Sequence, residues 1–356
     1  MDSLKILCVS NLQLGYPMRQ RYEAMLDIGF SVKGIDYAID QEHSSLLKYL
    51  GRLSYWLFRQ NVGNFPMLDV SNVNGQILDA MKETRWNILW LDRALVVDKH
   101  TLIRVKQLQP DCKIVGFSHD DMAQRHNQSK QFIEHLPFYD VFYTTKSYNV
   151  KELEGLGCKQ CEFIDNSFDP EIHRPFFHMH FNNNAHRYSV GFIGHWEKER
   201  EDLFNELAET GINISVWGGG WDKCSLRHSN LEINREDIVG DEYAKTLCSM
   251  DIALCMLRKI NRDLQTTRSI EIPACGVFML GERTDEHLAL FEEGKEAEFF
   301  STTDELTKKI EYYLNNPEKR EAIAAAGRER CLRSGYANQD RIKRIFEGLY
   351  SRSVLE

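Results

Sequence analysis

The stretch IALCMLRKINRDLQTTRSIEIPACGVFML, residues 252–280, carries the pattern that decides the fold. It opens with the apolar run 252–255 and closes with the apolar run 277–280, and a polar loop and a short helical segment ending at Gly276 separate the two runs. Apolar runs without strict alternation are typical of strands that are buried on both faces. Two such strands joined through a helix predict a parallel pair in an α/β sheet.

The same pattern continues outward from this stretch. Short apolar runs alternate with helical patterns that end at Gly or Pro, residues that terminate helices. The runs lie at 6–9, 88–91, 114–117 and 141–143 in the first half of the chain, and at 190–194 and 214–217 in the second. Strands that alternate with helices predict a doubly wound parallel sheet in each half.

The alternation pauses between residues 169 and 188, where prolines and a run of asparagines are typical of an interdomain linker. We therefore expect an N-terminal domain over residues 1–172, a linker over 173–188 and a C-terminal domain over 189–337. A last helix, about 338–356, has an apolar face that requires a partner, and the N-terminal domain can supply one. That face carries Ile342, Ile345, Phe346 and Leu349.

Two helix starts near the C-terminus can be predicted directly. Thr302 and Glu305 have the spacing of a capping box. Asn316 followed by Pro317 has the pattern of an N-cap and a first-turn proline.

The composition is typical of a globular protein with room for two cores: 356 residues, of which 42% are hydrophobic and 27% are charged. No stretch approaches the roughly 18 to 20 apolar residues that cross a bilayer, and the first residues lack a signal-peptide pattern. We expect a cytoplasmic protein without a transmembrane segment, which leaves peripheral contact with a membrane open. A net charge of −9 argues against a nucleic-acid partner, because neutralising phosphates needs a basic face.

The cysteine pattern gives no sign of disulfides or metal. The nine cysteines are an odd number, and several lie inside strand-like runs. Cys158 and Cys161 form one CxxC pair, but no second pair stands at zinc-ribbon spacing. The pair fits a strand edge better than a metal or redox site.

The densest polar cluster lies inside the opening stretch, over residues 258–271. It follows a strand, and open α/β sheets bind ligands at the carboxyl ends of their strands. Arginine and lysine can hold a diphosphate there by charge-assisted hydrogen bonds, and a carboxylate such as Glu271 can accept from a ribose diol. A solvated charged loop is the alternative.

Several motifs resemble those of CgeB-like (spore-maturation-type) glycosyltransferases. In the C-terminal domain they are RSIEIPACG at 268–276, FEEGKE at 291–296 and YLNNPEKRE at 313–321, within a match over about 190–333. Upstream, FSHDDM at 117–122 and TTKSYNV at 144–150 resemble the N-terminal half of the same group. The resemblance implies the GT-B fold, in which two Rossmann-like doubly wound domains face a central cleft, and it implies transfer of a sugar from a nucleotide-activated donor.

This group is similar to the large retaining GT-B superfamily, whose members carry two acids separated by seven residues. Asp263 and Glu271 stand at that spacing, with Asp in the position where Glu is usual. The resemblance implies that Glu271 contacts the donor ribose and that Asp263, or its neighbours, contacts the sugar hydroxyls.

The resemblance also implies a cationic clamp on the diphosphate. Arg200 is the first cation of this clamp, and Lys259 or Arg268 is the second. Gly194, in the turn before Arg200, is a further donor-binding residue that the resemblance implies. Fixed positive charge stabilises the nucleoside diphosphate that leaves as the glycosidic bond breaks. We therefore expect no metal and no cofactor besides the nucleotide-sugar substrate.

His119 follows the strand 114–117, where retaining relatives place a histidine that faces the donor sugar from the N-terminal domain. The two acids after it, Asp120 and Asp121, fit sugar contact or a helix N-cap better than a metal site, because no third ligand is near. The glycines 218–220 and the loop 11–16 are weaker candidates for ligand contact, and a glycine run after a strand is most often a turn.

Three functions fit these observations. The first is retaining sugar transfer to a glycan, protein or small-molecule acceptor. The second is a nucleotide-sugar 2-epimerase, which shares the architecture. The third is a non-catalytic GT-B binding module, for which the Asp at 263 is the best support. The sequence specifies neither the base and sugar of the donor nor the acceptor, the stereochemical outcome or the oligomeric state.

Overall fold

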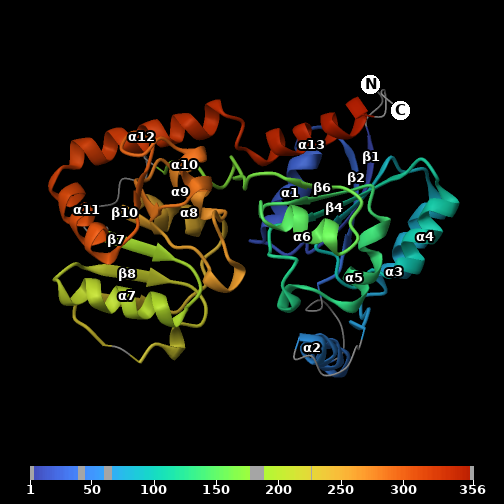
Figure 1. Cartoon of the computed structure of the whole chain (residues 1–356), viewed down its shortest axis with the longest axis horizontal. Helices are drawn as coiled ribbons and strands as arrows, with labels where there is room; N and C mark the ends of the chain where they lie inside the picture. Colours follow the sequence, from blue (N-terminus) through green and yellow to red (C-terminus); the bar gives the residue numbers. More distant parts are fainter. Residues whose placement is uncertain (1–3, 39–44, 60–65, 177–187, 226, 353–356) are drawn as a thin grey trace. The chain divides into compact units, whose positions relative to one another are not determined.

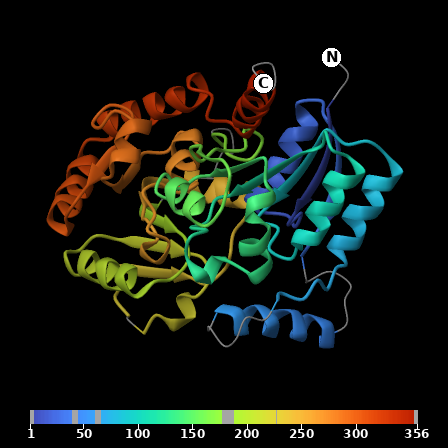
Figure 2. The same cartoon turned by 45° about the vertical axis from the view of Figure 1, so that its right-hand side comes forward.

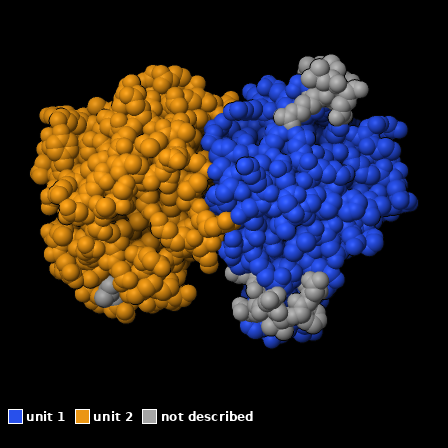
Figure 3. Space-filling view, in the orientation of Figure 1, with its two compact units in different colours: residues 1–165, 341–356 blue, residues 166–340 orange. Residues whose placement is uncertain are grey.

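The structure is a computed structural model that describes residues 4–38, 45–59, 66–176, 188–225 and 227–352. It contains two compact units (Figures 1 and 3). Unit 1 comprises residues 1–165 and 341–356, and unit 2 comprises residues 166–340. Each unit is an α/β fold around one six-stranded parallel sheet, which confirms the fold class predicted from the sequence.

The sheet of unit 1 has the strand order β2-β1-β3-β4-β5-β6. Its strands are β1 (Lys5–Ser10), β2 (Ser31–Asp36), β3 (Ile88–Asp92), β4 (Lys113–Ser118), β5 (Val141–Thr144) and β6 (Cys161–Phe163). The longer helices are α1 (Pro17–Asp27), α2 (Ser45–Arg59), α3 (Val73–Glu83), α4 (Lys99–Leu108), α5 (Lys130–His135), α6 (Asn149–Gly155) and α13 (Asn338–Arg352). Every apolar run predicted as a strand in this half is one, and the CxxC pair borders the edge strand β6.

Successive residues of β1 point to opposite faces of the sheet, so unit 1 has a core on each face. Leu7 and Val9 pack with α3, α4 and α5 on one face. Ile6 and Cys8 pack with α1 and α13 on the other. On that second face the ring of Phe346 in α13 lies edge-on to Trp90, with 6.0 Å between the ring centroids. The last helix therefore forms part of the core of unit 1.

The sheet of unit 2 has the strand order β12-β11-β10-β7-β8-β9. Its strands are β7 (Tyr188–Ile193), β8 (Ile214–Trp217), β9 (Leu231–Asn234), β10 (Met250–Cys255), β11 (Met279–Glu282) and β12 (Glu298–Phe300). The helices are α7 (Lys198–Glu209), α8 (Gly240–Cys248), α9 (Arg268–Ala274), α10 (Asp285–Leu290), α11 (Thr303–Asn315) and α12 (Pro317–Arg333). The opening stretch of the sequence thus forms β10, α9 and β11.

The first division between the units falls after Asp165, ahead of the linker expected over 173–188. The segment from Asn166 belongs to unit 2 because it is bonded and packed there. Asn166 donates through its backbone and side-chain nitrogens to Gln265 Oε1, at 3.0 Å each, and Phe168 is buried in the core with α8 and α9. Most of the expected linker, 177–187, lies outside the described residues.

Both predicted helix starts are confirmed. Thr302 is the N-cap of α11, and its hydroxyl accepts from the backbone N–H of Glu305. In a capping box the N3 carboxylate accepts from the N–H of the N-cap residue, here Thr302. The Glu305 carboxylate accepts instead from the N–H of Ser301, the residue before the N-cap. Asn316 and Pro317 begin α12.

Candidate functional site in unit 2

The strand order of unit 2 places a switch point between β7 and β10. From β7 the chain proceeds to β8 and β9 on one side, and from β10 it proceeds to β11 and β12 on the other. Helices that follow the two strands leave on opposite faces of such a sheet, and ligands bind in the crevice that this opens at the carboxyl ends. Two segments lie at these carboxyl ends: residues 194–200 after β7 and residues 256–268 after β10. Both contain residues that the sequence analysis proposed as donor-binding.

Gly194 turns the chain after β7 and lies against the glycine run after β8. Its N–H donates to Trp217 O at 2.8 Å, and its carbonyl accepts from Trp221 Nε1 at 2.9 Å. Gly218 has a φ of 128°, and a Cβ on it would lie 2.4 Å from the Gly194 carbonyl oxygen. The backbone groups of Gly194 are therefore engaged within the fold, and the glycine run is a turn that lets two loops approach closely.

Arg200, in the first turn of α7, is held in a buried position with 4% of its surface exposed. Its guanidinium donates to the carbonyls of His195 at 2.8 Å and Met256 at 3.3 Å. Burial lowers the pKa of Arg200 to about 10, with Glu197 opposing the shift and the nearby charges of Arg268 and Arg258 adding to it. Arg200 therefore stays a cation at neutral pH, and three arginines share one neighbourhood.

Glu197 bridges two of these arginines. Its Oε1 accepts from Arg258 Nε at 3.2 Å, and its Oε2 lies 3.5 Å from Arg200 Nη2. Lys259, the neighbour of Arg258 in the sequence, is two-thirds exposed and forms an ion pair with Glu282 instead. The sequence analysis did not propose Arg258 as a cation of the site. Arg258 and Lys259 are adjacent, and only the turn Lys259–Asn261 decides which of the two faces α7.

Glu271, in the first turn of α9, is buried, with 7% of its surface exposed. Tyr243 Oη in α8 donates to Glu271 Oε2 at 2.7 Å, and His173 Nε2 lies 3.7 Å from Oε1. The backbone N–H of Asp169 donates to His173 Nδ1 at 2.9 Å, so a neutral His173 carries its proton on Nε2, the nitrogen that faces Glu271. The Glu271 carboxylate is therefore buried and oriented by its neighbours. It differs in this from a surface acid whose only effect is to stabilise the helix dipole.

Arg268 links the arginines to Glu271. Burial and the Glu271 carboxylate raise the pKa of Tyr243, and the charge of Arg268 acts against that increase. Arg268 therefore acts electrostatically on both Arg200 and Tyr243. Arg200, Arg268 and Glu271, predicted from three separate positions in the sequence, lie in one charged neighbourhood, and each carboxylate oxygen of Glu271 can accept more than one hydrogen bond.

The loop that carries Asp263 is fixed by side chains behind it. Arg262 has a φ of 50°, a left-handed conformation that is rare outside glycine, and the Asp263 N–H donates to Arg258 O at 3.2 Å. Gln265 is fully buried and accepts the two bonds from Asn166 described above. Ser269 Oγ lies 2.7 Å from His287 Nε2 and accepts from the N–H of Thr266 at 2.9 Å.

His119 and Asp120 lie in unit 1, after the carboxyl end of β4. Arg21 makes two bonds to the Asp92 carboxylate, at 2.7 and 2.9 Å, and its Nη2 lies 3.5 Å from His119 Nδ1. Burial lowers the pKa of His119, so it is neutral near pH 7. Since the guanidinium can only donate, Nδ1 is the acceptor and Nε2 carries the proton.

The two acids after His119 are engaged in different ways. Asp120 forms an ion pair with Arg93 at 2.8 Å, and buried Asp121 accepts from Asn149 Nδ2 at 2.8 Å. The helix N-cap interpretation is wrong, because the next helical turn begins only at Arg125 and its N-cap is Gln124. Within the described part of the chain, no group of three or more His, Cys, Asp or Glu side chains is placed to hold a metal ion.

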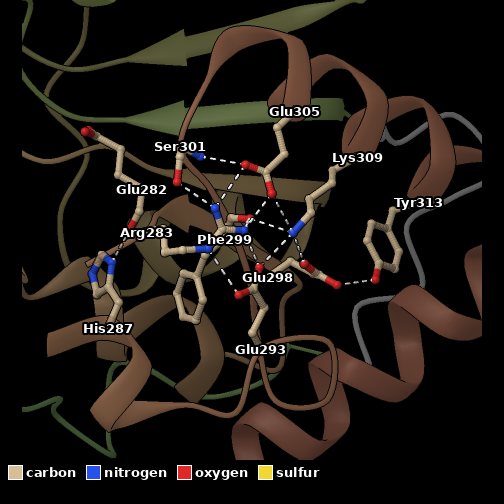
Figure 4. A network of polar contacts seen from close by, with 10 residues as sticks. All are labelled: Glu282, Arg283, His287, Glu293, Glu298, Phe299, Ser301, Glu305, Lys309 and Tyr313. Carbon is tan, nitrogen blue, oxygen red and sulfur yellow. Dashed lines mark hydrogen bonds and ion pairs between the residues drawn. The ribbon is translucent and has the colours of Figure 1, made fainter. Parts of the chain in front are cut away.

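A hollow of about 580 Å³ lies over α11, apart from the loops of the candidate site. Figure 4 shows the ion-pair network below it, in which Arg283 contacts Glu293 and Glu305 and Lys309 contacts Glu293 and Glu298. Arg283 lowers the pKa of Glu305 to about 2. These ion pairs connect β12, α11 and the loop at Glu293, so we assign the network a structural role.

Residues 198–347 match the protein-family model described as "Glycosyl transferase-like". No curated protein sequence matches the chain. None of the helices in the described ranges is long and apolar enough to cross a membrane.

Solved structures match nearly the whole chain. An α-glucosyltransferase in complex with UDP and a 13-mer DNA containing an HMU base superimposes with a TM-score of 0.66 at 14% identity, over 97% of this chain and 99% of that one. Sucrose-phosphate synthase from Thermosynechococcus elongatus gives 0.63 at 13% identity, over 98% and 100%. HepE from Anabaena in complex with UDP and glucose gives 0.60 at 13% identity, over 98% and 100%. The fold and the family match of residues 198–347 point to a glycosyltransferase of the GT-B fold.

Proposed function

We propose that the protein transfers a sugar from a nucleoside diphosphate sugar to an acceptor, with retention of configuration and without a metal ion. The observation that carries the proposal is the group of Arg200, Arg258 and Arg268 beside buried Glu271, at the switch point of unit 2. Two of the three structures named above contain UDP. By the motifs at 268–276 and 117–122, we place the chain in the CgeB-like group.

In this proposal each group of unit 2 has one task. The arginines bind the diphosphate and stabilise the charge that develops on it as the glycosidic bond breaks, which is the contribution of preorganised donors in a water-excluded site. Glu271 accepts from the ribose hydroxyls, and Asp263 contacts the sugar. Gly194 shapes the loop that carries Arg200, because its own backbone groups are engaged. Of the two second cations that the sequence left open, we choose Arg268, since Lys259 is ion-paired with Glu282.

In this proposal His119 of unit 1 contacts the donor sugar. A neutral imidazole with its proton on Nε2 can donate to a sugar hydroxyl without adding charge to the site. The Arg21–Asp92 pair holds the ring in that tautomer through the contact at Nδ1. Asp120, which is ion-paired with Arg93, contacts the sugar beside it in this proposal.

We propose a cytoplasmic location, where nucleotide sugars are substrates. The nine cysteines form no disulfide with one another, and eight of them are buried. Cysteines kept as thiols fit a reducing compartment. The acceptor is a glycan, a protein or a small molecule in this proposal.

The proposal is tested by incubating the purified chain with a panel of nucleoside diphosphate sugars, first alone and then with candidate acceptors. Release of nucleoside diphosphate, with the sugar attached to water or an acceptor, supports sugar transfer. Conversion of the sugar at C2 without an acceptor would identify a 2-epimerase instead. Binding without turnover would identify a binding module. Such binding is detected as a shift in the thermal unfolding temperature, because a ligand at 100 times its dissociation constant stabilises the folded protein by about 2.7 kcal/mol.

A further inference from the structure

Residues 166–173, the first of unit 2 after β6, lie against a second stretch of unit 2, residues 336–338, where α13 begins. The backbone N–H of Phe168 donates to Tyr336 O at 3.1 Å, and the N–H of Asn338 donates to Phe168 O at 2.8 Å. In Figures 1 and 2 the green chain that follows β6 lies beside the red stretch before α13. The segment is therefore fixed to unit 2 by main-chain bonds.

The start of this segment is bonded to the loop that carries Asp263. The backbone N–H and the side-chain amide of Asn166 both donate to Gln265 Oε1, at 3.0 Å each. Both side chains are buried, with 4% of Asn166 and none of Gln265 exposed. Gln265 stands only two residues after Asp263. Because a loop takes its conformation from such tertiary bonds, Asn166 contributes to the placement of Asp263.

The end of the segment lies beside Glu271. The ring of His173 packs edge-on against Tyr243, with 5.7 Å between the ring centroids, and Tyr243 is the residue that donates to Glu271. His173 Nε2, at 3.7 Å from Glu271 Oε1, is too far away for a hydrogen bond but places its N–H dipole beside the carboxylate. Since interiors are close-packed, the buried ring limits the positions that Tyr243 and Glu271 can take.

We propose that residues 166–173 support the donor site, with Asn166 as a positioning residue for Asp263 and His173 as a positioning residue for Glu271. This inference rests on the proposed function, in which Asp263 contacts the sugar and Glu271 contacts the ribose. The two ends of the segment then act on different parts of the donor. Asn166 acts on binding of the sugar, and His173 acts on binding of the nucleotide, which the nucleoside diphosphate and its sugar share.

The alternative is that these contacts only attach the segment to unit 2. Attachment alone contributes to the free energy of unfolding. Its loss would then weaken binding of a nucleoside diphosphate and of its sugar equally, or would weaken neither. A change confined to the ligand that carries a sugar distinguishes positioning of Asp263 from attachment.

The first test compares Asn166→Ala with Asn230→Ala. The control removes another side-chain amide bond of unit 2, from Asn230 Nδ2 to Ala208 O at 3.2 Å. Calorimetric titration with UDP and with UDP-glucose, or with the corresponding pair that the donor panel identifies, measures both dissociation constants. We expect Asn166→Ala to raise the constant for UDP-glucose about two- to tenfold, as for the loss of one hydrogen bond, and to change that for UDP less than about twofold. The control should change neither constant, and thermal unfolding measures the stability of both variants.

The second test uses His173→Asn. Asparagine keeps an oxygen that can accept from the N–H of Asp169, the bond that His173 Nδ1 accepts in the parent, and it removes the ring beside Tyr243. We expect the dissociation constants of UDP and UDP-glucose to rise by the same factor, about two- to tenfold. In a Glu271→Gln background the substitution should add little, because a positioning residue acts through the residue that it positions.

Two results distinguish this proposal from the proposed function. A parent chain that binds neither a nucleoside diphosphate nor its sugar would refute the proposed function, and the role of the segment with it. A parent chain that binds both and is weakened by Glu271→Gln, while Asn166→Ala and His173→Asn keep the parental affinities, would overturn the role of the segment alone. Equal weakening of UDP and UDP-glucose by Asn166→Ala, or fully additive losses for His173→Asn with Glu271→Gln, would overturn it as well.

Discussion

Tyr243 Oη donates to Oε2 of Glu271 over 2.7 Å, and this bond joins α8 to the first turn of α9 in the interior of unit 2. Only 7% of Glu271 is exposed, so its direction is set by its neighbours and not by solvent. A carboxylate that is already oriented loses little conformational freedom when it accepts from a ligand.

Glu271→Gln is expected to weaken binding of nucleoside diphosphate by roughly tenfold or more, because charge-assisted hydrogen bonds are worth about 1.5 to 3 kcal/mol. The amide keeps the shape of the side chain and removes its charge. Isothermal titration calorimetry with UDP, and with the other nucleoside diphosphates if UDP does not bind, measures the change. Glu311→Gln, at an exposed position of α11, is the control. An unaltered dissociation constant in Glu271→Gln would falsify the donor-site assignment.

Tyr243→Phe removes the bond that orients Glu271 and leaves the carboxylate in place. We expect affinity for nucleoside diphosphate to fall about two- to tenfold, since one hydrogen bond contributes about 0.5 to 1.5 kcal/mol. The same titration, repeated in a Glu271→Gln background, separates positioning from a direct contact. If Tyr243 acts through Glu271, the second substitution adds little to the first. Fully additive losses would show that Tyr243 acts by itself.

Arg258→Ala and Lys259→Ala form a matched pair of adjacent cations. Arg258 belongs to the arginine group through Glu197, whereas Lys259 pairs with Glu282 at the surface. We expect Arg258→Ala to raise the dissociation constant for nucleoside diphosphate roughly tenfold. Lys259→Ala should change it less than about twofold, as expected for an exposed pair. The reverse order of effects would make Lys259 the second cation.

Turnover is expected to continue in EDTA, because Arg200, Arg258 and Arg268 supply positive charge at the leaving diphosphate. The measurement is the release of nucleoside diphosphate with EDTA, and then with added magnesium or manganese. Loss of activity in EDTA with rescue by a metal would refute metal independence. It would also direct attention to Asp120 and Asp121 as ligands.

His135 predicts a pH dependence of stability in unit 1. The residue is fully buried, with Nδ1 2.7 Å from Val97 O and Nε2 3.0 Å from Tyr139 Oη, so its neutral form is satisfied at both nitrogens. Burial lowers the pKa of His135 from 6.5 to about 4. Between these values the unfolded chain binds more protons than the folded chain, so the free energy of unfolding falls as the pH falls.

The full effect across this window is about 3 kcal/mol, at 1.36 kcal/mol for each unit of pKa difference. Urea denaturation at pH 7 and near pH 4.5 measures it. His135→Gln should be less stable at both pH values but lose less between them, and His100→Gln, at an exposed position, should follow the parent. Equal losses in parent and His135→Gln would contradict the prediction.

The sequence by itself determined the architecture. Buried strands of an α/β protein are local apolar runs, and their helices end at local glycine and proline signals, so the four inner strands of each sheet and the starts of α11 and α12 could be predicted from short windows. The edge strands β2, β6, β9 and β12 were not among the predicted runs. The motif around Glu271 also predicts a ligand site, because polar residues after β10 fall at the carboxyl edge of a parallel sheet. These inferences need no knowledge of which distant residues meet.

Tertiary structure alone decided the neighbours of Glu271 and the partners of the arginines. His173 lies in a segment that the sequence suggested as linker, and it reaches Glu271 only because Asn166 and Phe168 attach that segment to unit 2. Arg258 and Lys259 have the same charge and adjacent positions, and only the backbone turn after β10 directs one toward Glu197 and the other toward Glu282. The physical reason is that side-chain direction in a loop depends on backbone dihedrals and on contacts with residues far away in the chain, which no local pattern encodes.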